Sequence, residues 1–399
     1  MMIRMKLLAL IPSFYGRTGD AVNERKLILA LSRKIEKSYV VTFVSFKQVF
    51  TKRRRELKEV KNLPKNIIII PLPLFHVNPL LVYFCMIIIS CFTSIIGLVL
   101  CWLRKIDLIY IRNSFLSIGF LSFKPLAKRT VVKIPAIIED ELSNGIITRF
   151  CITRLALLMD RLVLAKAVRV AIPSRSLYSE LVKRRFLKHK HVPLEIPPGV
   201  DLRLIEKIKS QLDSKSRRDT LNIGFIGSLK WWQGVDILAQ AATLLKRKVS
   251  NLKLVIIGDG ELKPLIERIC KTSNIPYEIT GFLPHEEALR RLSMLDVMVL
   301  SRRRTTTTES NIPIKVIEAW ALGIPVIVTK HRVFLDSQIG NYEDVIYCEP
   351  EPNSVANAIY LLITNDKLRK KLESNGPQLA RQFDYERIAE KLLKVCTVV

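Results

Sequence analysis

A polar loop, a helix start and a short buried strand follow one another in residues 301–328, and their side chains could bind a phosphorylated ligand. Three arginines, Arg302, Arg303 and Arg304, stand in the loop after an apolar stretch. Pro313 fits the first position of a helix, because its missing N–H would have no partner there. A basic loop that leads into a helix N-terminus is a favourable site for an anionic phosphate.

The helix predicted after this loop carries two further candidates. Lys315 and Glu318 are three residues apart and therefore lie on one helix face. The carboxylate can accept hydrogen bonds from two vicinal sugar hydroxyls, and the ammonium group can compensate phosphate charge. Gly323 ends the helix, and the apolar run after it predicts a short buried strand. Phosphate and sugar together indicate an activated-sugar nucleotide as the ligand.

This segment resembles the donor-site motif of glycosyltransferase family 4, whose members retain the anomeric configuration of the sugar. Other segments agree with the resemblance in order and spacing: LIYIRN (108–113), IPPGVD (196–201), NIGFIGSLKWWQGVDIL (222–238), KLVIIGDGEL (253–262) and TGFLPHEEAL (280–289). The resemblance covers nearly the full length. It implies the GT-B fold, an α/β architecture of two facing Rossmann-like domains with parallel sheets, in which the last helix crosses back to the first domain.

The resemblance also implies donor-site roles in the second half of the chain. Glu318 matches the glutamate that binds the ribose hydroxyls of the nucleotide. Counting back eight residues reaches Ser310, so Glu309 matches the family's other glutamate, which contacts the donor sugar, only with a shift of one. The remaining donor candidates are a glycine at a strand end, a loop that resembles the base-binding loop, and one residue of the motif helix: Gly227, Gly281, Phe282, Leu283 and Ile314.

Two cations that compensate the diphosphate in the family pattern are missing here. Ser228 and Gln233 occupy their positions. A departing diphosphate needs compensating positive charge, so we expect Lys315, Lys230 and one or two of the three loop arginines as substitutes. Lys315, Glu309 and Lys230 are the candidate catalytic groups. A non-catalytic relative that binds nucleotide without turnover remains the alternative.

The first half offers candidates for the acceptor side. The loop and helix start that contain Gly16, Gly19, Asp20 and Asn23 resemble the family's N-terminal glycine loop. Arg112 and Asn113 end a predicted strand and are candidates for the same region. Glu139 and Asp140 follow another predicted strand, where a carboxylate could orient an acceptor hydroxyl. A solvated loop is the alternative for these two carboxylates.

The chain is long enough for two domains. Seven strand-like segments precede residue 200 and six follow it, with helical patterns between them. We predict an acceptor-binding domain over residues 1–205, a linker over 206–220, a nucleotide-sugar-binding domain over 221–377 and a C-terminal helix over 378–399 that packs on the first domain.

Cysteines and histidines offer no metal site. The seven cysteines form no C-x-x-C pair, and the five histidines show no metal-ligand spacing. Scattered cysteines suit a reducing, cytoplasmic setting. The resemblance likewise implies that neither a metal ion nor another cofactor takes part.

Positive charge is concentrated in the first half, because residues 1–205 contribute +22 of the net charge of +28. Such a surface indicates an anionic partner. No nucleic-acid-binding signature occurs, and aromatic residues are not interleaved with the basic runs. We therefore favour an anionic membrane surface over nucleic acid. A generally high pI without such a partner is the alternative.

Residues 66–103 contain no charged side chain, and residues 80–103 are almost wholly apolar. Hydropathy alone would predict a transmembrane helix. However, predicted strands on both sides belong to one sheet, and a single span would divide that sheet between the two sides of a bilayer. We predict a long helix that covers the sheet, with its outer face either in the lipid headgroups or buried. The basic run 52–55 would add attraction to an anionic leaflet.

Together these features predict the transfer of a hexose from a UDP- or GDP-linked sugar to a lipid-linked or glycan acceptor. The protein would act as a peripheral protein at the cytoplasmic, inner face of the membrane. Three alternatives remain: the non-catalytic relative, a basic nucleic-acid-binding protein, and a nucleotide-sugar epimerase of the same fold, which would react without an acceptor.

Overall fold

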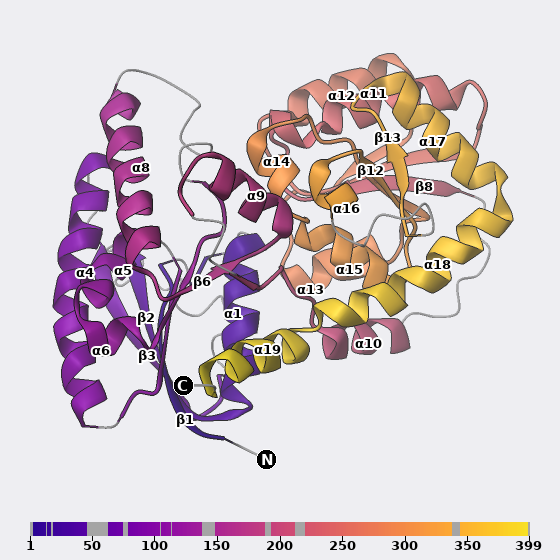
Figure 1. The fold of residues 1–399 in the computed structure, drawn as a ribbon. Coiled ribbons are helices and arrows are strands. Elements are labelled where there is room, and N and C mark those ends of the chain that lie inside the picture. Colours follow the sequence, from indigo (N-terminus) through magenta and orange to yellow (C-terminus); the bar gives the residue numbers. More distant parts are fainter. Residues whose placement is uncertain are drawn as a thin grey trace. The chain divides into compact units, whose positions relative to one another are not determined.

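The chain forms two units, each with a parallel sheet between helices (Figure 1). The computed structural model describes residues 3–12, 14–16, 19–45, 63–74, 79–103, 105–112, 114–137, 148–187, 193–211, 220–336 and 344–397. Unit 1 comprises Met1–Gly199 and Tyr385–Val399, and unit 2 comprises Val200–Asp384. The basic run 52–55, Asn113, Glu139 and Asp140 lie outside the described residues.

Unit 1 is built on a seven-stranded parallel sheet of order β3-β2-β1-β4-β5-β6-β7. The strands are β1 (Ile3–Leu10), β2 (Ile35–Ser45), β3 (Ile67–Leu74), β4 (Leu108–Arg112), β5 (Thr130–Lys133), β6 (Arg169–Ile172) and β7 (Leu194–Glu195). Strands β4 (LIYIR) and β5 (TVVK) show no alternation of buried and exposed side chains, and both are almost fully buried. This burial is typical of parallel strands that helices cover on both faces.

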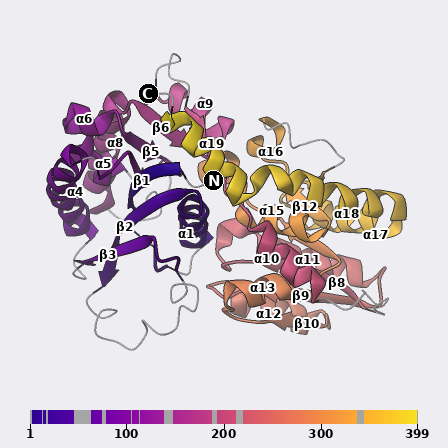
Figure 2. The same ribbon diagram turned by 90° about the horizontal axis from the view of Figure 1, so that it is seen from below.

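Helices cover the two faces of this sheet (Figure 2). One side has α1 (Gly19–Ser32) and α19 (Tyr385–Thr397), which pack on each other and on β1. The other side has α4 (Pro79–Trp102), α5 (Ser114–Ser122), α6 (Lys124–Ala127) and α8 (Thr148–Lys166), and α9 (Arg175–Lys183) follows β6. Ion pairs from Arg33 and Lys34 to Glu386 add to the apolar contacts of α19. The return of the last helix to the first unit is thus confirmed.

Unit 2 has a six-stranded parallel sheet of order β10-β9-β8-β11-β12-β13. The strands are β8 (Leu221–Ile226), β9 (Leu252–Ile257), β10 (Tyr277–Ile279), β11 (Val297–Leu300), β12 (Val326–Thr329) and β13 (Ile346–Cys348). The helices are α10 (Leu202–Ser210), α11 (Val235–Lys246), α12 (Lys263–Thr272), α13 (His285–Leu292), α14 (Thr306–Ser310), α15 (Ile314–Leu322), α16 (Arg332–Asp336), α17 (Pro352–Thr364) and α18 (Asp366–Ala380). Two short 3₁₀ helices are η2 (Trp231–Gln233) and η3 (Arg381–Phe383).

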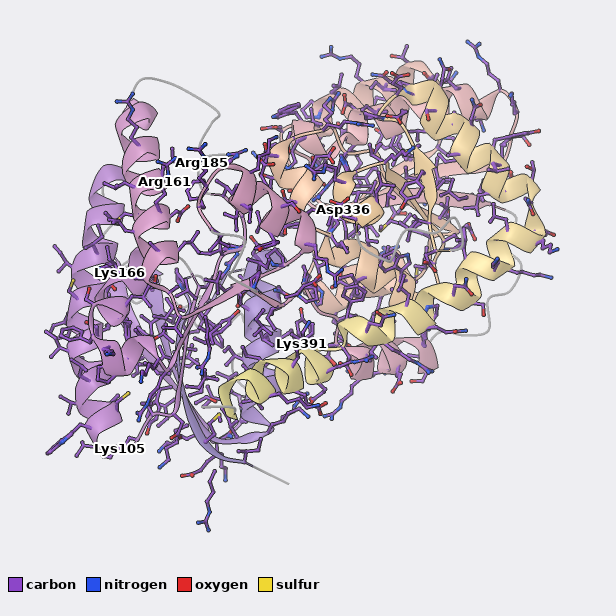
Figure 3. The ribbon with its side chains drawn as sticks, in the orientation of Figure 1. Lys105, Arg161, Lys166, Arg185, Asp336 and Lys391 are labelled. Carbon is purple, nitrogen blue, oxygen red and sulfur yellow. The ribbon has the colours of Figure 1, made fainter. Side chains whose placement is uncertain are left out.

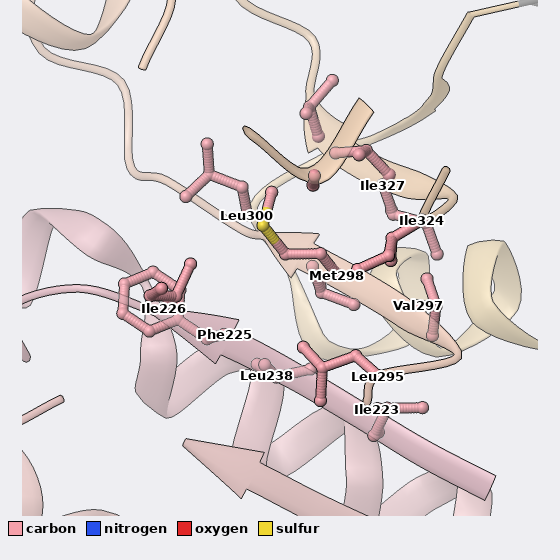
Figure 4. Close-up of a cluster of buried hydrophobic side chains, with 14 of the residues drawn as sticks. Ile223, Phe225, Ile226, Leu238, Leu295, Val297, Met298, Leu300, Ile324 and Ile327 are labelled. Atoms are coloured by element: carbon pink, nitrogen blue, oxygen red, sulfur yellow. The ribbon is translucent and has the colours of Figure 1, made fainter. Parts of the chain in front are cut away.

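The apolar core of unit 2 fixes β8 against β11 (Figure 4). Phe225 of β8, Met298 of β11 and Leu238 of α11 are buried there. Both strands therefore end at defined positions, and the loops that follow them start side by side. In each unit the strand order reverses at one place, between β1 and β4 and between β8 and β11. Open α/β sheets bind ligands outside the carboxyl ends of strands at such a point.

The predicted α/β class with two parallel sheets is confirmed, and every predicted strand occurs within a few residues of its expected position. Some boundaries differ. Pro313 is the residue before α15 rather than its first residue. Residues 202–210, which the prediction divides between the first domain and the linker, form α10, whose Ile205 and Ile208 are buried in unit 2. Within the part of the chain that is described, no helix has both the length and the apolar character to span a membrane.

Candidate functional site

The loops after β8 and β11 are joined to each other at the switch point of unit 2. Gly234 has a φ of 68°, and a Cβ atom there would collide with the carbonyl oxygen of Ser301. The Ser301 hydroxyl donates to the Gly234 carbonyl at 2.7 Å, and the Arg303 N–H donates to the Trp232 carbonyl at 3.0 Å. These contacts hold the basic loop directly against the glycine-containing turn.

Lys315 places its ammonium group at the carboxyl end of β8. Lys315 is the second residue of α15. Its Nζ atom lies 4.2 Å from the Phe225 ring centroid and against the backbone of Gly227. Gly227 has a φ of 132°, which favours glycine, and a Cβ atom there would meet this ammonium group. Burial, reinforced by the charge of Arg302, holds the pKa of Lys315 well below its ordinary value. An anion bound beside Lys315 would raise this pKa again, because its negative charge opposes the effects of burial and of Arg302.

The three loop arginines lie in three different places. Arg302 donates from Nε to Oε1 of Gln233 at 3.1 Å, so the residue at the missing lysine position anchors an arginine that acts on Lys315. Arg303 forms two hydrogen bonds with Asp236, at 2.8 and 2.6 Å, and Arg304 pairs with the exposed Glu349 at 2.7 Å. Of the three, Arg302 is the arginine whose charge lowers the pKa of Lys315.

Lys230 is also engaged away from Lys315. Its ammonium group pairs with Glu261 at 3.2 Å, and both side chains are exposed. The same glutamate accepts a hydrogen bond from the Trp231 N–H at 3.1 Å. Lys230 thus holds the turn after β8, whereas the ammonium group of Lys315 lies at the strand end itself.

Glu318 is buried, one turn into α15 from Lys315. Its Oε1 atom is 2.6 Å from Nε2 of His285, the first residue of α13. Because a carboxylate only accepts, the histidine donates from Nε2. The sequence assigns no role to His285. The PHEE sequence marks that helix start, but no spacing could predict a bond to a residue 33 positions away.

Glu309 is directed to α16. Its Oε2 accepts the N–H of Arg332 at 2.6 Å, and its Oε1 is 3.0 Å from Nδ1 of the buried His331. Burial alone would raise the pKa of Glu309, but these two hydrogen bonds outweigh it and hold the pKa below its ordinary value. Both oxygens are thus engaged at the start of α16.

The remaining donor candidates divide into packed and open residues. Ser310 is buried, and its hydroxyl donates to the Thr306 carbonyl at 2.7 Å. Leu283 packs on the core of unit 2, and Ile314 is half-buried. Gly281 has a φ of 69° with open space around its Cα, and the neighbouring Phe282 is exposed. The Gly281–Phe282 turn therefore offers backbone groups and an aromatic face to solvent.

The switch point of unit 1 holds a buried ionic cluster that sequence reasoning missed in part. Glu24 of α1 lies 3.0 Å from Lys133 and 3.5 Å from Arg112, at the ends of β5 and β4. The Tyr110 hydroxyl donates to Glu24 at 2.9 Å, and the exposed Asp20 pairs with Arg112 at 3.2 Å. Burial would raise the pKa of Glu24, but Lys133 and Arg112 outweigh it and lower that pKa.

Two acceptor-side candidates have packing contacts. Asn23 is buried, and its Oδ1 accepts hydrogen bonds from the Gly199 N–H and the Tyr385 hydroxyl, both at 3.0 Å. The carbonyl of Gly16 accepts a bond from Arg25 at 3.2 Å, which closes the turn before Gly19 and α1. Asn23 therefore fixes α19 to α1. Among the acceptor-side candidates, Asp20 at the start of α1 and Arg112 at the end of β4 form an ion pair.

Residues 206–379 match the family model described as Glycosyl transferases group 1. The second unit belongs to the glycosyl transferases group 1 family. The resemblance drawn from the motifs is thus confirmed for the group 1 unit. An uncharacterized glycosyltransferase of Methanocaldococcus jannaschii is 28% identical over 172 residues, which cover 43% of this chain and 46% of that protein. The chain spans about half the length of the curated relatives it matches.

Solved structures share the fold of both units. Sucrose-phosphate synthase from Thermosynechococcus elongatus superposes with a TM-score of 0.72 at 16% identity, covering 98% of each chain. Anabaena HepE, solved in complex with UDP and glucose, gives a TM-score of 0.69 at 16% identity, covering 99% of this chain and all of that one. The GT-B fold class predicted from the motifs is therefore confirmed along with the group 1 unit.

Proposed function

We propose that the protein is a retaining glycosyltransferase that moves a hexose from a UDP- or GDP-linked sugar to an acceptor hydroxyl. The observation that carries this proposal is the position of the Lys315 ammonium group against the Gly227 turn, at the switch point of a group 1 unit, with Arg302 hydrogen-bonded to Gln233 in the loop that follows. The complex of Anabaena HepE with UDP supports a nucleotide-sugar as donor.

In the proposed reaction, the bond between the anomeric carbon and the diphosphate oxygen breaks while the acceptor oxygen bonds to the same face of that carbon. The acceptor proton passes to the departing diphosphate oxygen, so no protein nucleophile is needed. Lys315 and Arg302 stabilise the growing negative charge. Glu318 accepts hydrogen bonds from the ribose hydroxyls, and the Gly281–Phe282 turn contacts the base.

The acceptor in this proposal is lipid-linked or a glycan, reached at the cytoplasmic face of a membrane by a peripheral protein. Two features support this choice. The first half of the chain carries +22 of the net charge of +28, and the helix α4 exposes large apolar side chains. Asp20 and Arg112 are the candidates that would contact the acceptor from unit 1.

Nucleotide release tests the reaction. The purified protein is incubated with UDP- and GDP-sugars, each with and without a membrane extract as a source of acceptor. Release of UDP or GDP that depends on the extract supports the transferase. Release without an acceptor supports a hydrolase, conversion of the donor to an isomeric nucleotide-sugar supports an epimerase, and neither release nor conversion with any donor contradicts the enzyme.

The alternative is a non-catalytic unit that binds nucleotide without turnover, and the loss of cations at Ser228 and Gln233 favours it. Thermal unfolding separates the two. A nucleoside diphosphate at about 100 times its dissociation constant adds about 2.7 kcal/mol of stability. Stabilisation by UDP or GDP without release of nucleotide from any sugar donor would support this alternative.

A further inference from the structure

The outer face of α4 is apolar, which is the reverse of a helix at a water-exposed protein surface. Large side chains follow helical spacing along that face, and Phe92 and Trp102 are 62% and 83% exposed. The exposed set is Ile88, Phe92, Ile95, Ile96, Val99 and Trp102. We call these six residues the α4 stripe. Contiguous apolar surface of this kind marks an interaction site.

The inner face of α4 is small and polar instead. The buried residues on this side are Ser90, Thr93, Ser94, Gly97 and Cys101. Thr93 and Ser94 satisfy their hydroxyls within the helix, on the carbonyls of Ile89 and Cys91 at 2.7 Å each. The polar atoms of these side chains therefore do not need water.

A close contact between α4 and α5 explains why small residues point inward. The Ser90 hydroxyl donates to the Leu116 carbonyl at 2.6 Å and accepts the Gly119 N–H at 3.0 Å. A Cβ atom on Gly119 would lie 2.6 Å from the Ser90 carbonyl oxygen, so the two backbones touch. Small residues and hydrogen bonds between helices, with large apolar residues outside, are how helices pack in lipid.

Basic charge surrounds this apolar face. Helix α8, on the other side of α5, exposes Leu158 and Leu162 together with Arg161 and Lys166, while its one acidic residue, Asp160, is buried. Figure 3 shows Lys105 at the foot of α4 and Arg161 and Lys166 on α8. This charge is complementary to anionic headgroups. A symmetric dimer through the same face would instead bring like charges together.

We propose that the α4 stripe docks unit 1 on an anionic lipid bilayer. Helix α4 lies in the interface of the membrane. The other stripe residues lie among the upper acyl chains, and Trp102 and Lys105 lie at headgroup level. The bilayer is thereby the surface from which a lipid-linked acceptor is taken. Only this last step rests on the proposed function, because the docking itself follows from α4, α5 and α8.

Vesicle co-sedimentation tests the docking with the full chain. Vesicles of phosphatidylcholine with phosphatidylglycerol should bind the wild type, and vesicles of phosphatidylcholine alone should bind it more weakly. Phe92→Glu combined with Val99→Glu should lower the binding constant about 10- to 100-fold, because each change withdraws a buried apolar side chain from lipid. Both side chains are exposed, so the fold should persist. Leu361→Glu, at an exposed apolar site in unit 2, is the matched control and should bind as the wild type does.

Fluorescence gives a second measurement at the stripe itself. The emission of Trp102 should shift to shorter wavelength on anionic vesicles, and Trp102→Phe should abolish that part of the shift. Unchanged vesicle binding by the double glutamate variant would overturn the proposal, as would a wild type that ignores both vesicles. A soluble wild-type dimer that the double variant converts to a monomer would assign the stripe to a second copy instead. Vesicle binding without any nucleotide release would leave the docking intact and remove only the transferase.

Discussion

The switch points of the two sheets bring cations to the same kind of position but balance them differently. In unit 1, Arg112 and Lys133 meet Glu24, and Asp20 adds a second carboxylate. In unit 2, burial and the charge of Arg302 lower the pKa of Lys315, and the carboxylate of Glu318, which acts in the opposite direction, is bonded to His285. The first group is an internally neutralised cluster, and the second carries an excess of positive charge.

This difference assigns different chemistry to the two strand ends. A buried ion pair with complete partners stabilises a fold only modestly, but it is costly to break. Half-buried cations without enough negative charge are costly in the empty protein, and an anionic ligand reduces that cost. We therefore expect changes at Glu24 to act on stability and changes at Lys315 and Arg302 to act on ligand affinity.

The largest effect is expected in unit 1. Glu24→Gln leaves Lys133 buried beside Arg112 without its carboxylate, and breaking a buried pair in this way costs about 3–5 kcal/mol. The free energy of unfolding of unit 1, followed by urea and circular dichroism, should fall by that amount. Glu36→Gln, at the exposed partner of Lys6, is the control and should cost less than about 1 kcal/mol. Equal losses in the two variants would remove the distinction between the units.

The second effect concerns Lys315. Lys315→Met should lower the rate of sugar transfer about 10²- to 10³-fold, as expected for the loss of one group that stabilises the transition-state charge. The thermal midpoint without ligand should not fall, because burial already disfavours the charged amine. Lys271→Met, an exposed change on α12, serves as the control. A Lys315→Met protein that transfers sugar at the wild-type rate would contradict the assignment of the diphosphate site.

The third effect separates the arginines. Arg302→Gln should weaken UDP or GDP binding about 10- to 100-fold, in line with the loss of a hydrogen bond to a charged group. Arg304→Gln should weaken it by no more than about twofold, since that arginine pairs with Glu349 in an exposed position. Calorimetric titration with the nucleoside diphosphate and with the nucleoside alone measures the difference. If both variants lose affinity equally, Arg302 has no special place beside Lys315.

The strands could be predicted from the sequence, because they depend on local patterns. Apolar runs such as residues 252–257 predict buried strands, and the basic loop before Pro313 has the composition of a phosphate site. Contacts between distant side chains could not be predicted in this way. Gln233 and Arg302 are 69 positions apart, and their bond depends on how the two loops are joined.

The orientation of α4 shows the same limit. Its composition predicts an apolar helix, but the residues that face the protein are decided by the fit of Ser90 against Gly119 on another helix. The direction of Glu309 is a further case. The sequence places it near the motif position, whereas the N–H of Arg332 and the ring of His331 draw it to the start of α16.

The smallest effect concerns His285, which positions Glu318 in the proposed ribose site. His285→Ala should free the carboxylate to turn and weaken UDP or GDP binding about 5- to 10-fold, the size of one ordinary hydrogen bond, because the histidine acts on the ligand only through Glu318. His285→Gln should retain most of the affinity, because its amide nitrogen can donate from nearly the same place.

The sugar of the nucleotide distinguishes positioning from general damage. If Glu318 holds the ribose hydroxyls, the wild type should bind the nucleoside diphosphate more tightly than its 2′,3′-dideoxy analogue, and His285→Ala should reduce that preference. A merely structural histidine would weaken both ligands by the same factor and leave the ratio unchanged. That ratio therefore decides whether the bond of 2.6 Å between His285 and Glu318 prepares a ligand site or only fastens α13 to α15.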